Sequence, residues 1–163
     1  MKRNKTLEIA TGGIIAALYV ALTFVAQAFG MASGAIQLRL SEALTILPCF
    51  TVSAVPGLTV GCVLANLLTG CAPWDVVFGS LATLIGAVGT RMMKNHIGWA
   101  WIPPVLSNAV IIPFVLQRVY GVPDAWWFLA LTVGAGELVA CGLLGILVAK
   151  AAERVPQLNG ERT

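Results

Sequence analysis

Charged residues are scarce in this chain, which has ten lysines and arginines and seven aspartates and glutamates among 163 residues. Hydrophobic residues make up 58% of the sequence, and its mean hydropathy is +0.89. Soluble domains contain roughly 45–50% apolar and about 25% charged residues, and a fold of this size cannot bury such an apolar excess. The composition therefore excludes a soluble enzyme, a nucleic-acid binder and a disordered regulator, and it indicates an integral membrane protein.

Motifs for catalysis and metal binding are also lacking. The sequence has a single histidine, His96, no nucleophile–base pair and no phosphate loop of the GxxxxGK(S/T) type. Its four cysteines lie in apolar stretches without CxxC or metal-type spacing, so we expect small core residues rather than disulfides or zinc ligands. We therefore expect no ATPase activity, no resident cofactor or metal, and no enzymatic reaction.

Apolar runs long enough to form membrane helices fill most of the chain, because about 20 apolar residues span a bilayer core. We expect one membrane domain, an all-α bundle of six transmembrane helices at 9–29, 41–52, 57–71, 76–93, 103–118 and 125–149. The second run is short, and Leu47-Pro48 predicts a kink within it.

Basic residues predict the orientation of this bundle, because cytoplasmic loops carry the excess of Lys and Arg. With six spans and the N-terminus inside, eight of the ten basic residues are cytoplasmic, and only Arg39 and Arg118 face outwards. We therefore expect both termini in the cytoplasm. The basic start and Ala26-Gln27-Ala28 also resemble a cleaved secretory signal, but the apolar run between them is longer than such signals usually have.

Small residues recur at every fourth position of the first expected helix, at Gly13, Ala17 and Ala21, with Gly12 and Ala16 beside them. This spacing lines one helix face with small side chains and allows another helix backbone to approach closely in lipid. Two interpretations are open, packing within this chain and a docking face for another membrane protein.

Ionisable residues within membrane spans are costly, so each one indicates a function. Glu137 lies in the sixth expected span, next to Gly134 and Gly136, and no basic residue is within a helical turn of it. Asn66 and Asn108 lie in the third and fifth expected spans. An interhelical hydrogen bond would explain either amide alone, whereas together with Glu137 they suggest the polar floor of a pocket.

Further polar residues lie at the outer ends of the expected helices. Arg39 and Glu42 are three residues apart, so they either pair with each other or leave Glu42 for a ligand. Trp74 suits the aromatic belt of a membrane protein, and Asp75 suits a helix cap or a ligand contact. We expect these four residues to form the mouth of one outward-opening pocket. Its carboxylate–amide floor suits a neutral, planar, donor-rich heterocycle, since a carboxylate accepts two parallel hydrogen bonds.

Two segments are distinctive, Pro73-Trp74-Asp75 and Pro103-Pro104-Val105-Leu106-Ser107-Asn108. With these and with residues 36–44, 56–58, 65–67 and 136–137, the chain resembles the QueT family of small membrane S-components of energy-coupling factor (ECF) transporters. The resemblance implies a six-helix bundle of the ECF S-component type in a bacterial plasma membrane. It implies capture of a queuosine precursor (queuine, preQ1 or preQ0) at the outer face. The implied partners are a transmembrane coupling subunit of the EcfT type and two ATP-binding subunits.

The resemblance also implies roles for single residues. Ala17 and Ala21 match an AxxxA-like pattern that docks on the coupling subunit, with Gly13 on the same face. Glu137 would bind the deazaguanine edge, Trp74 would stack on the bicycle, and Glu42 or Asp75 would pair with an amine. The expected substrate-binding residues are Glu137, Asn108, Asn66, Trp74, Asp75, Glu42, Arg39 and Gln37. An S-component for another small vitamin, and a small integral-membrane enzyme or assembly factor, are the alternatives.

Overall fold

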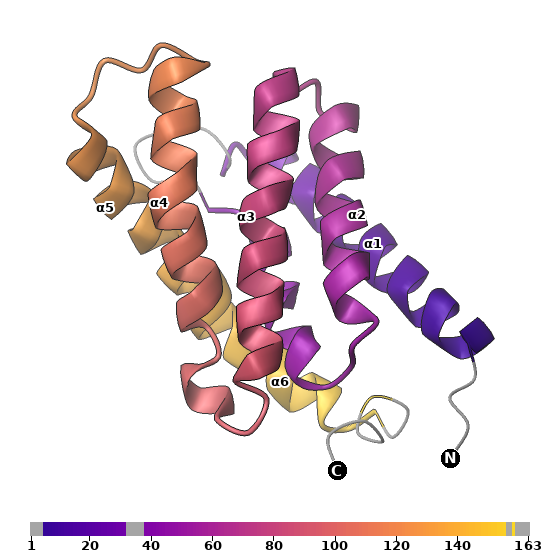
Figure 1. Cartoon of the computed structure of the whole chain (residues 1–163). Helices are drawn as coiled ribbons and strands as arrows, with labels where there is room; N and C mark the ends of the chain where they lie inside the picture. Colours follow the sequence, from indigo (N-terminus) through magenta and orange to yellow (C-terminus); the bar gives the residue numbers. More distant parts are fainter. Residues whose placement is uncertain (1–4, 32–37, 156–157, 159–163) are drawn as a thin grey trace.

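The structure is a computed structural model that describes residues 5–31, 38–155 and 158, and within these it contains helices and no strands. The α-helices are α1 (Lys5–Ala28), α2 (Ala54–Leu68), α3 (Pro73–Met92), α4 (Ile102–Arg118), α5 (Trp126–Glu137) and α6 (Gly145–Ala152). Two 3-10 helices, η1 (Leu40–Cys49) and η2 (Ile97–Trp99), and one π-helix, η3 (Leu138–Leu144), complete the described elements. Figure 1 shows them assembled into one bundle, which confirms the all-helical expectation.

Four helical stretches among the described residues are long and apolar enough to cross a membrane: Lys5–Ala28, Pro73–Met92, Ile97–Arg118 and Trp126–Ala152. The last stretch is the continuous run of α5, η3 and α6. The apolar segments Leu40–Cys49 and Ala54–Leu68 are shorter. A helical segment therefore occupies each of the six expected spans, and four of these segments reach the length that a bilayer core of about 30 Å requires.

Prolines and glycines determine where several helices begin and end. Pro73 starts α3, and Pro103 and Pro104 lie in the first turn of α4, where a missing backbone N–H breaks no helical bond. Gly70 follows α2 with a φ of +75°, and Gly121 follows α4 with a φ of +65°. Such left-handed conformations suit glycine, because it has no Cβ.

The short segment η1 lies inside the bundle rather than at its surface. Its residues from Ser41 to Cys49 are buried, and it packs against α1, α3 and α6. The kinked helix expected here is a tightly wound 3-10 helix with Pro48 near its end. At a rise of about 2 Å per residue, this winding carries η1 through the centre of the bundle, so its polar side chains face several helices at once.

Two glycines of α2 bring α1 and α2 close together. A Cβ at Gly57 would lie 2.7 Å from the carbonyl oxygen of Gly12. A Cβ at Gly61 would lie 2.8 Å from the Cβ of Tyr19 and 3.0 Å from the Cα of Ala16. Larger side chains would push the helices apart, so the small residues Gly12 and Ala16 serve packing within this chain.

The other small residues of α1 face outwards. Gly13, Ala17 and Ala21 are exposed, and a Cβ on Gly13 would meet no atom within 4 Å. Exposed Ile14 and Leu18 lie beside them. Both interpretations of the small-residue pattern therefore have residues to support them, because α1 presents one small face to α2 and leaves the second face uncovered by the described residues.

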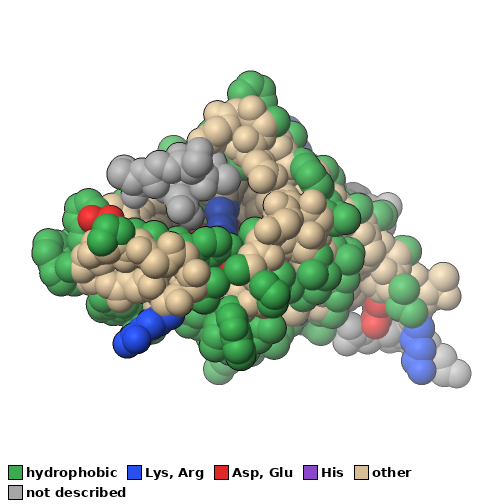
Figure 2. Space-filling model, turned by 90° about the horizontal axis from the view of Figure 1, so that it is seen from above, with side chains coloured by type: hydrophobic (Ala, Val, Ile, Leu, Met, Phe, Trp, Pro, Cys, Tyr) green, Lys and Arg blue, Asp and Glu red, His purple; other side chains and the backbone are tan. Residues whose placement is uncertain are grey.

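The two ends of the bundle differ in charge. We call the end that bears Lys5 and Ala152 the lower end, and the end that bears the α2–α3 turn and the α4–α5 connection the upper end (Figure 1). Hydrophobic side chains surround the periphery when the molecule is viewed from above (Figure 2). Five described basic residues belong to the lower end, Lys5, Arg91, Lys94, Lys150 and Arg154, and two belong to the upper end, Arg39 and Arg118.

Candidate functional site

A cavity of about 380 Å³ opens at the upper end of the bundle. Its walls come from the C-terminal parts of α1, α2 and α4 and from the start of α3. In Figure 2, which views this end, a basic side chain lies in the hollow between the helices. Apolar lining is mixed with a few polar side chains, as in most small-molecule sites. The polar lining residues used below are Tyr19, Arg39, Ser41, Asn66, Asp75 and Tyr120.

Tyr120 holds the carboxylate of Asp75 at the edge of this cavity. The Tyr120 hydroxyl donates to Asp75 Oδ2 at 2.9 Å and accepts a bond from the backbone N–H of Ala72 at 3.2 Å. Partial burial and the neighbouring carboxylate raise the pKa of Tyr120 to about 12, so the hydroxyl keeps the proton that it donates. Asp75 Oδ1 is buried and has no hydrogen-bond partner among the described residues, which leaves it available as an acceptor.

Asn66 lies in the same cavity wall, and its side-chain amide forms weak hydrogen bonds with two cysteine sulfurs. Its Nδ2 donates to Cys62 Sγ at 3.6 Å, and its Oδ1 accepts from Cys71 Sγ at 4.0 Å. Gly79 separates Asn66 from Asp75, since a Cβ there would lie 3.1 Å from Asn66 Nδ2 and 3.4 Å from Asp75 Oδ1. The absence of a side chain at Gly79 therefore leaves both polar groups uncrowded.

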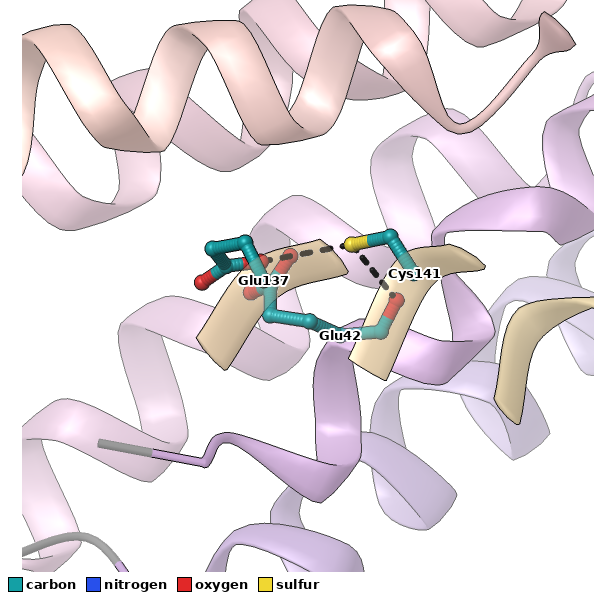
Figure 3. A group of neighbouring side chains, drawn as sticks. All are labelled: Glu42, Glu137 and Cys141. Atoms are coloured by element: carbon teal, nitrogen blue, oxygen red, sulfur yellow. Dashed lines mark hydrogen bonds between the residues drawn. The ribbon is translucent and has the colours of Figure 1, made fainter. Parts of the chain in front are cut away.

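A second cluster of polar side chains is buried in the bundle and contains two acids. Glu42 in η1 is 0% exposed, and Glu137 at the end of α5 is 3% exposed. One oxygen of each acid and the sulfur of Cys141 lie within 4.8 Å of one another (Figure 3). The Cys141 thiol donates to Glu137 Oε2 at 3.2 Å and to the backbone carbonyl of Glu42 at 3.5 Å. Two acids this close in an apolar interior need protons, a cation or ligand donors to balance them.

Neighbouring helices contribute further polar side chains to these acids. The Tyr19 hydroxyl of α1 donates to Glu42 Oε1, and the Thr83 hydroxyl of α3 donates to the same oxygen at 3.4 Å. Asn108 of α4 is 1% exposed and lies beside both carboxyl groups. Within the described part of the chain, Glu42 Oε2 and both polar atoms of the Asn108 amide lack a hydrogen-bond partner.

The polar side chains that line the cavity and the buried cluster around Glu42 and Glu137 are adjacent. Tyr19 lines the cavity and also donates to Glu42, and Ser41, which lines the cavity, directly precedes Glu42 in the chain. The buried acids therefore lie behind Tyr19, next to the cavity but not among the residues that line it. We call Glu42, Asn108 and Glu137 the floor of the site.

The types of residue in the buried group also fit a metal ion. Glu42, Glu137 and Cys141 each offer one donor atom, and two carboxylates with a thiolate would suit zinc. In the structure Cys141 Sγ lies 3.2 Å from Glu137 Oε2 and 3.5 Å from the carbonyl oxygen of Glu42, two contacts that the single hydrogen of a thiol can share.

The structure places most of the expected site residues at the upper end but groups them differently. Glu42, expected at the mouth, lies on the floor with Glu137 and Asn108, because η1 turns inward. Asn66, expected on the floor, lines the open cavity. Asp75 and Arg39, expected at the mouth, line the cavity as well.

Two expected residues are not brought to the cavity. Trp74 is 62% exposed, and its ring stacks on Phe78 with the centroids 6.0 Å apart. This position on the outside of α3 suits the aromatic belt rather than stacking on a ligand in the cavity. Gln37 lies outside the described residues.

The sequence reasoning missed Tyr19, Thr83, Tyr120 and Cys141. In the sequence, Tyr19 and Cys141 look like ordinary members of apolar runs. The one available signal was that a tyrosine within a membrane span must find a hydrogen-bond partner for its hydroxyl. A search for such a partner would have had to consider every acid and carbonyl in the chain.

Comparisons with known proteins identify the family of the chain. A model of the QueT transporter family matches residues 9–154. The queuosine precursor transporter QueT of Lactococcus lactis subsp. cremoris (strain MG1363) is 40% identical over 86 residues, which are 52% of this chain and 50% of that protein. The alignment thus spans about half the length of this relative. No solved structure matches the chain. Because the family match covers nearly all of the sequence, the chain belongs to the QueT transporter family.

Proposed function

We propose that this chain is the substrate-binding S-component of an ECF-type importer and that it binds a queuosine precursor, namely queuine, preQ1 or preQ0. The observation that carries the proposal is the cavity with polar walls at the upper end, behind whose lining residue Tyr19 lies the buried cluster of Glu42, Asn108 and Glu137. Membership of a transporter family and the name of the L. lactis relative support this class of ligand. The sequence has no nucleotide-binding loop, so separate subunits hydrolyse ATP.

The cavity fits a small planar base in size and chemistry. Its volume of about 380 Å³ lies within the usual range for small-molecule sites. The buried carboxylates of Glu42 and Glu137 accept hydrogen bonds from the ring, and Asn66 contributes an amide in the wall. Tyr120 holds the Asp75 carboxylate by a hydrogen bond to Oδ2. The other oxygen, Oδ1, accepts a hydrogen bond from an amine on the ligand. Arg39 lines the same wall and partly balances these negative charges.

The distribution of basic residues supports capture of the ligand from outside the cell. Most of the described basic residues belong to the lower end, which the positive-inside tendency assigns to the cytoplasm. The cavity opens at the opposite end. In this orientation the six helical segments span or enter the membrane, and the cavity faces the exterior of a bacterial plasma membrane.

The uncovered small-residue face of α1 is the docking surface for a transmembrane coupling subunit of the EcfT type. Gly13, Ala17 and Ala21 are exposed and lie on one side of the helix. Small side chains allow close contact between helices in lipid, where van der Waals packing drives association. Two ATP-binding subunits complete the importer.

A ligand panel tests this function. The full chain is purified in lipid nanodiscs, and isothermal titration calorimetry measures binding of queuine, preQ1 and preQ0 beside riboflavin and biotin. We expect at least one queuosine precursor to bind with one-to-one stoichiometry and neither vitamin to bind. Selective binding of a vitamin would support the alternative of a different S-component, and turnover of a substrate without an ATPase partner would support an enzyme.

A further inference from the structure

We infer that the buried cluster of Glu42, Glu137 and Cys141 binds a zinc ion inside the bundle. The amide oxygen of Asn108 supplies the fourth donor. The inference goes beyond the proposed function and does not depend on it, because it concerns an ion held within the protein rather than a transported ligand.

The donor atoms are spaced as zinc requires. One carboxylate oxygen of Glu42, one of Glu137 and the Cys141 sulfur lie within 4.8 Å of one another (Figure 3). In a tetrahedral site, Zn–S bonds of about 2.3 Å and Zn–O bonds of about 2.0–2.2 Å separate sulfur from oxygen by about 3.5 Å. The distance from Cys141 Sγ to Glu137 Oε2 is 3.2 Å. An ion therefore fits between these atoms with small shifts of the side chains.

Two oxygens at the cluster lack the partners that buried polar atoms need. Glu42 Oε2 and Asn108 Oδ1 have no hydrogen-bond partner within the described part of the chain, although Glu42 is 0% and Asn108 is 1% exposed. Asn108 comes from a different helix, α4, and lies beside both carboxyl groups. Buried polar atoms in native proteins are almost always paired, so these oxygens point to an ion that they share.

Neighbouring hydroxyls orient the donors, as outer-shell partners do in metal sites. Tyr19 and Thr83 both donate to Glu42 Oε1, which leaves Oε2 for the ion. The Thr45 hydroxyl lies 3.4 Å from Cys141 Sγ and 2.6 Å from the carbonyl oxygen of Glu42. Residues of α1, α3 and η1 therefore hold the donors in place before an ion arrives.

The chemistry of the donors favours zinc over calcium and magnesium. Calcium takes about six to eight oxygen ligands and magnesium requires octahedral oxygen coordination, whereas this cluster has few oxygens and includes a sulfur. Thiolate ligands favour zinc, and the Cys141 thiol releases its proton when the ion binds. The divalent charge balances two acids that would otherwise repel each other in an apolar interior. Arg39 interacts electrostatically with Glu42 and balances the negative charge that remains.

A zinc ion in the cluster is compatible with the ligand contacts proposed above. Glu42 Oε1 is bonded to Tyr19, whose side chain lines the cavity. The ion takes one oxygen of each acid, so the other oxygen remains for a ligand. Zinc then fixes the acids behind Tyr19 and joins η1 to α4 and to the continuous run of α5 and η3.

Metal binding to the full chain in lipid nanodiscs, without any transported ligand, tests the inference. A chelator removes bound metal, and isothermal titration calorimetry then measures binding of zinc chloride. We expect one-to-one binding and a melting temperature about 5–10 °C higher when free zinc is at a hundredfold excess over its dissociation constant. Failure to bind zinc, or tighter binding of calcium or magnesium, would overturn the inference. The proposed function fails on a different result, namely that no queuosine precursor binds.

Cobalt reports whether Cys141 is a ligand, because Co²⁺ replaces zinc in tetrahedral sites and a thiolate ligand adds an intense charge-transfer band in the near ultraviolet. We expect Cys141→Ser to abolish this band and to weaken zinc binding at least tenfold. Cys49→Ser removes another buried thiol and should change neither value. Glu42→Gln and Glu137→Gln should also weaken zinc binding at least tenfold. Zinc binding that survives Cys141→Ser unchanged would place the ion elsewhere and overturn the inference.

A reciprocal variant covers the case in which Cys141→Ser does not fold. It keeps Cys141 and replaces the other three cysteines by serine, at Cys49, Cys62 and Cys71. We expect the charge-transfer band to persist, because Cys141 is then the only thiol in the chain. Loss of the band from this folded variant, or its absence from the native chain, would overturn the inference.

Discussion

Asp75 and Tyr120 show how one residue positions another at the mouth of the site. Tyr120 bonds both to the Asp75 carboxylate and to the backbone N–H of Ala72, so it connects the α4–α5 connection to the start of α3. The bond leaves the second oxygen of Asp75 without a partner among the described side chains. A carboxylate fixed in this way presents a defined acceptor to the cavity rather than a mobile charge.

The substitution Tyr120→Phe removes this bond and keeps the ring. We expect it to weaken binding of an amine-bearing precursor about fivefold, which corresponds to about 1 kcal/mol for one hydrogen bond. Because the pKa of Tyr120 is about 12, the hydroxyl is protonated throughout the neutral and mildly alkaline range, and the loss should not vary with pH there. Calorimetry with preQ1 measures the effect, and preQ0, which has no amine on its arm, is the control. Equal loss for both ligands would mean that Asp75 does not contact the amine.

At the scale of elements, α1 has two faces with different surroundings. One face packs on Gly57 and Gly61 of α2, where a Cβ would clash with α1. The other face, which carries Gly13, is uncovered. Because Tyr19 lies on α1 as well, the crossing of α1 and α2 also determines where the hydroxyl that bonds Glu42 is placed.

A matched pair of glycine substitutions tests this division. Gly61→Ala forces a methyl group to within 2.8 Å of Tyr19 Cβ, so we expect a loss of about 1–3 kcal/mol in folding free energy. Gly13→Ala adds the same methyl group where no atom lies within 4 Å, and its better helix propensity should be neutral or stabilising by up to about 1 kcal/mol. Thermal unfolding in detergent measures both effects. For a chain of this size, the melting temperature shifts by about 2–4 °C for each kcal/mol of change in folding free energy. Equal melting temperatures would contradict the close crossing.

At the scale of the whole molecule, three features are arranged around one bundle: a basic lower end, a cavity at the upper end, and an uncovered face of small residues along α1. They lie on different surfaces, so the proposed ligand and the proposed partner would not compete for the same residues. The buried acids, the cavity and the uncovered small-residue face nevertheless share α1, through Tyr19 on one side and Ala17 on the other.

If the exposed small-residue face of α1 docks on the coupling subunit, substitutions on this face should block assembly without weakening ligand binding. Ala17→Trp and Ala21→Trp place a large ring on the exposed small-residue face, so we expect them to abolish co-purification with the coupling subunit. Ligand affinity should stay within about twofold of the native value, because both positions are exposed and neither lines the cavity. Leu131→Trp is the control, since Leu131 is exposed on α5. Intact co-purification of either alanine variant would refute the docking face.

Composition and run length were sufficient to predict a helical membrane protein, because they are local properties of the chain. The same reasoning found Glu137, Asn66 and Asn108, since a polar residue is conspicuous in an apolar run. The residues alone suggested a planar, donor-rich ligand, and the resemblance suggested the family, which the comparison confirmed.

The grouping of these residues depends on the tertiary structure. Glu42 joins the floor because η1 turns into the bundle, and it then meets Tyr19 and Thr83, which are 23 and 41 residues away in the sequence. Such contacts depend on how helices cross, and the helix crossings here depend on glycines such as Gly57 and Gly61. Helical periodicity predicts which residues share a helix face. It does not predict which faces contact each other, because packing between distant segments determines those contacts.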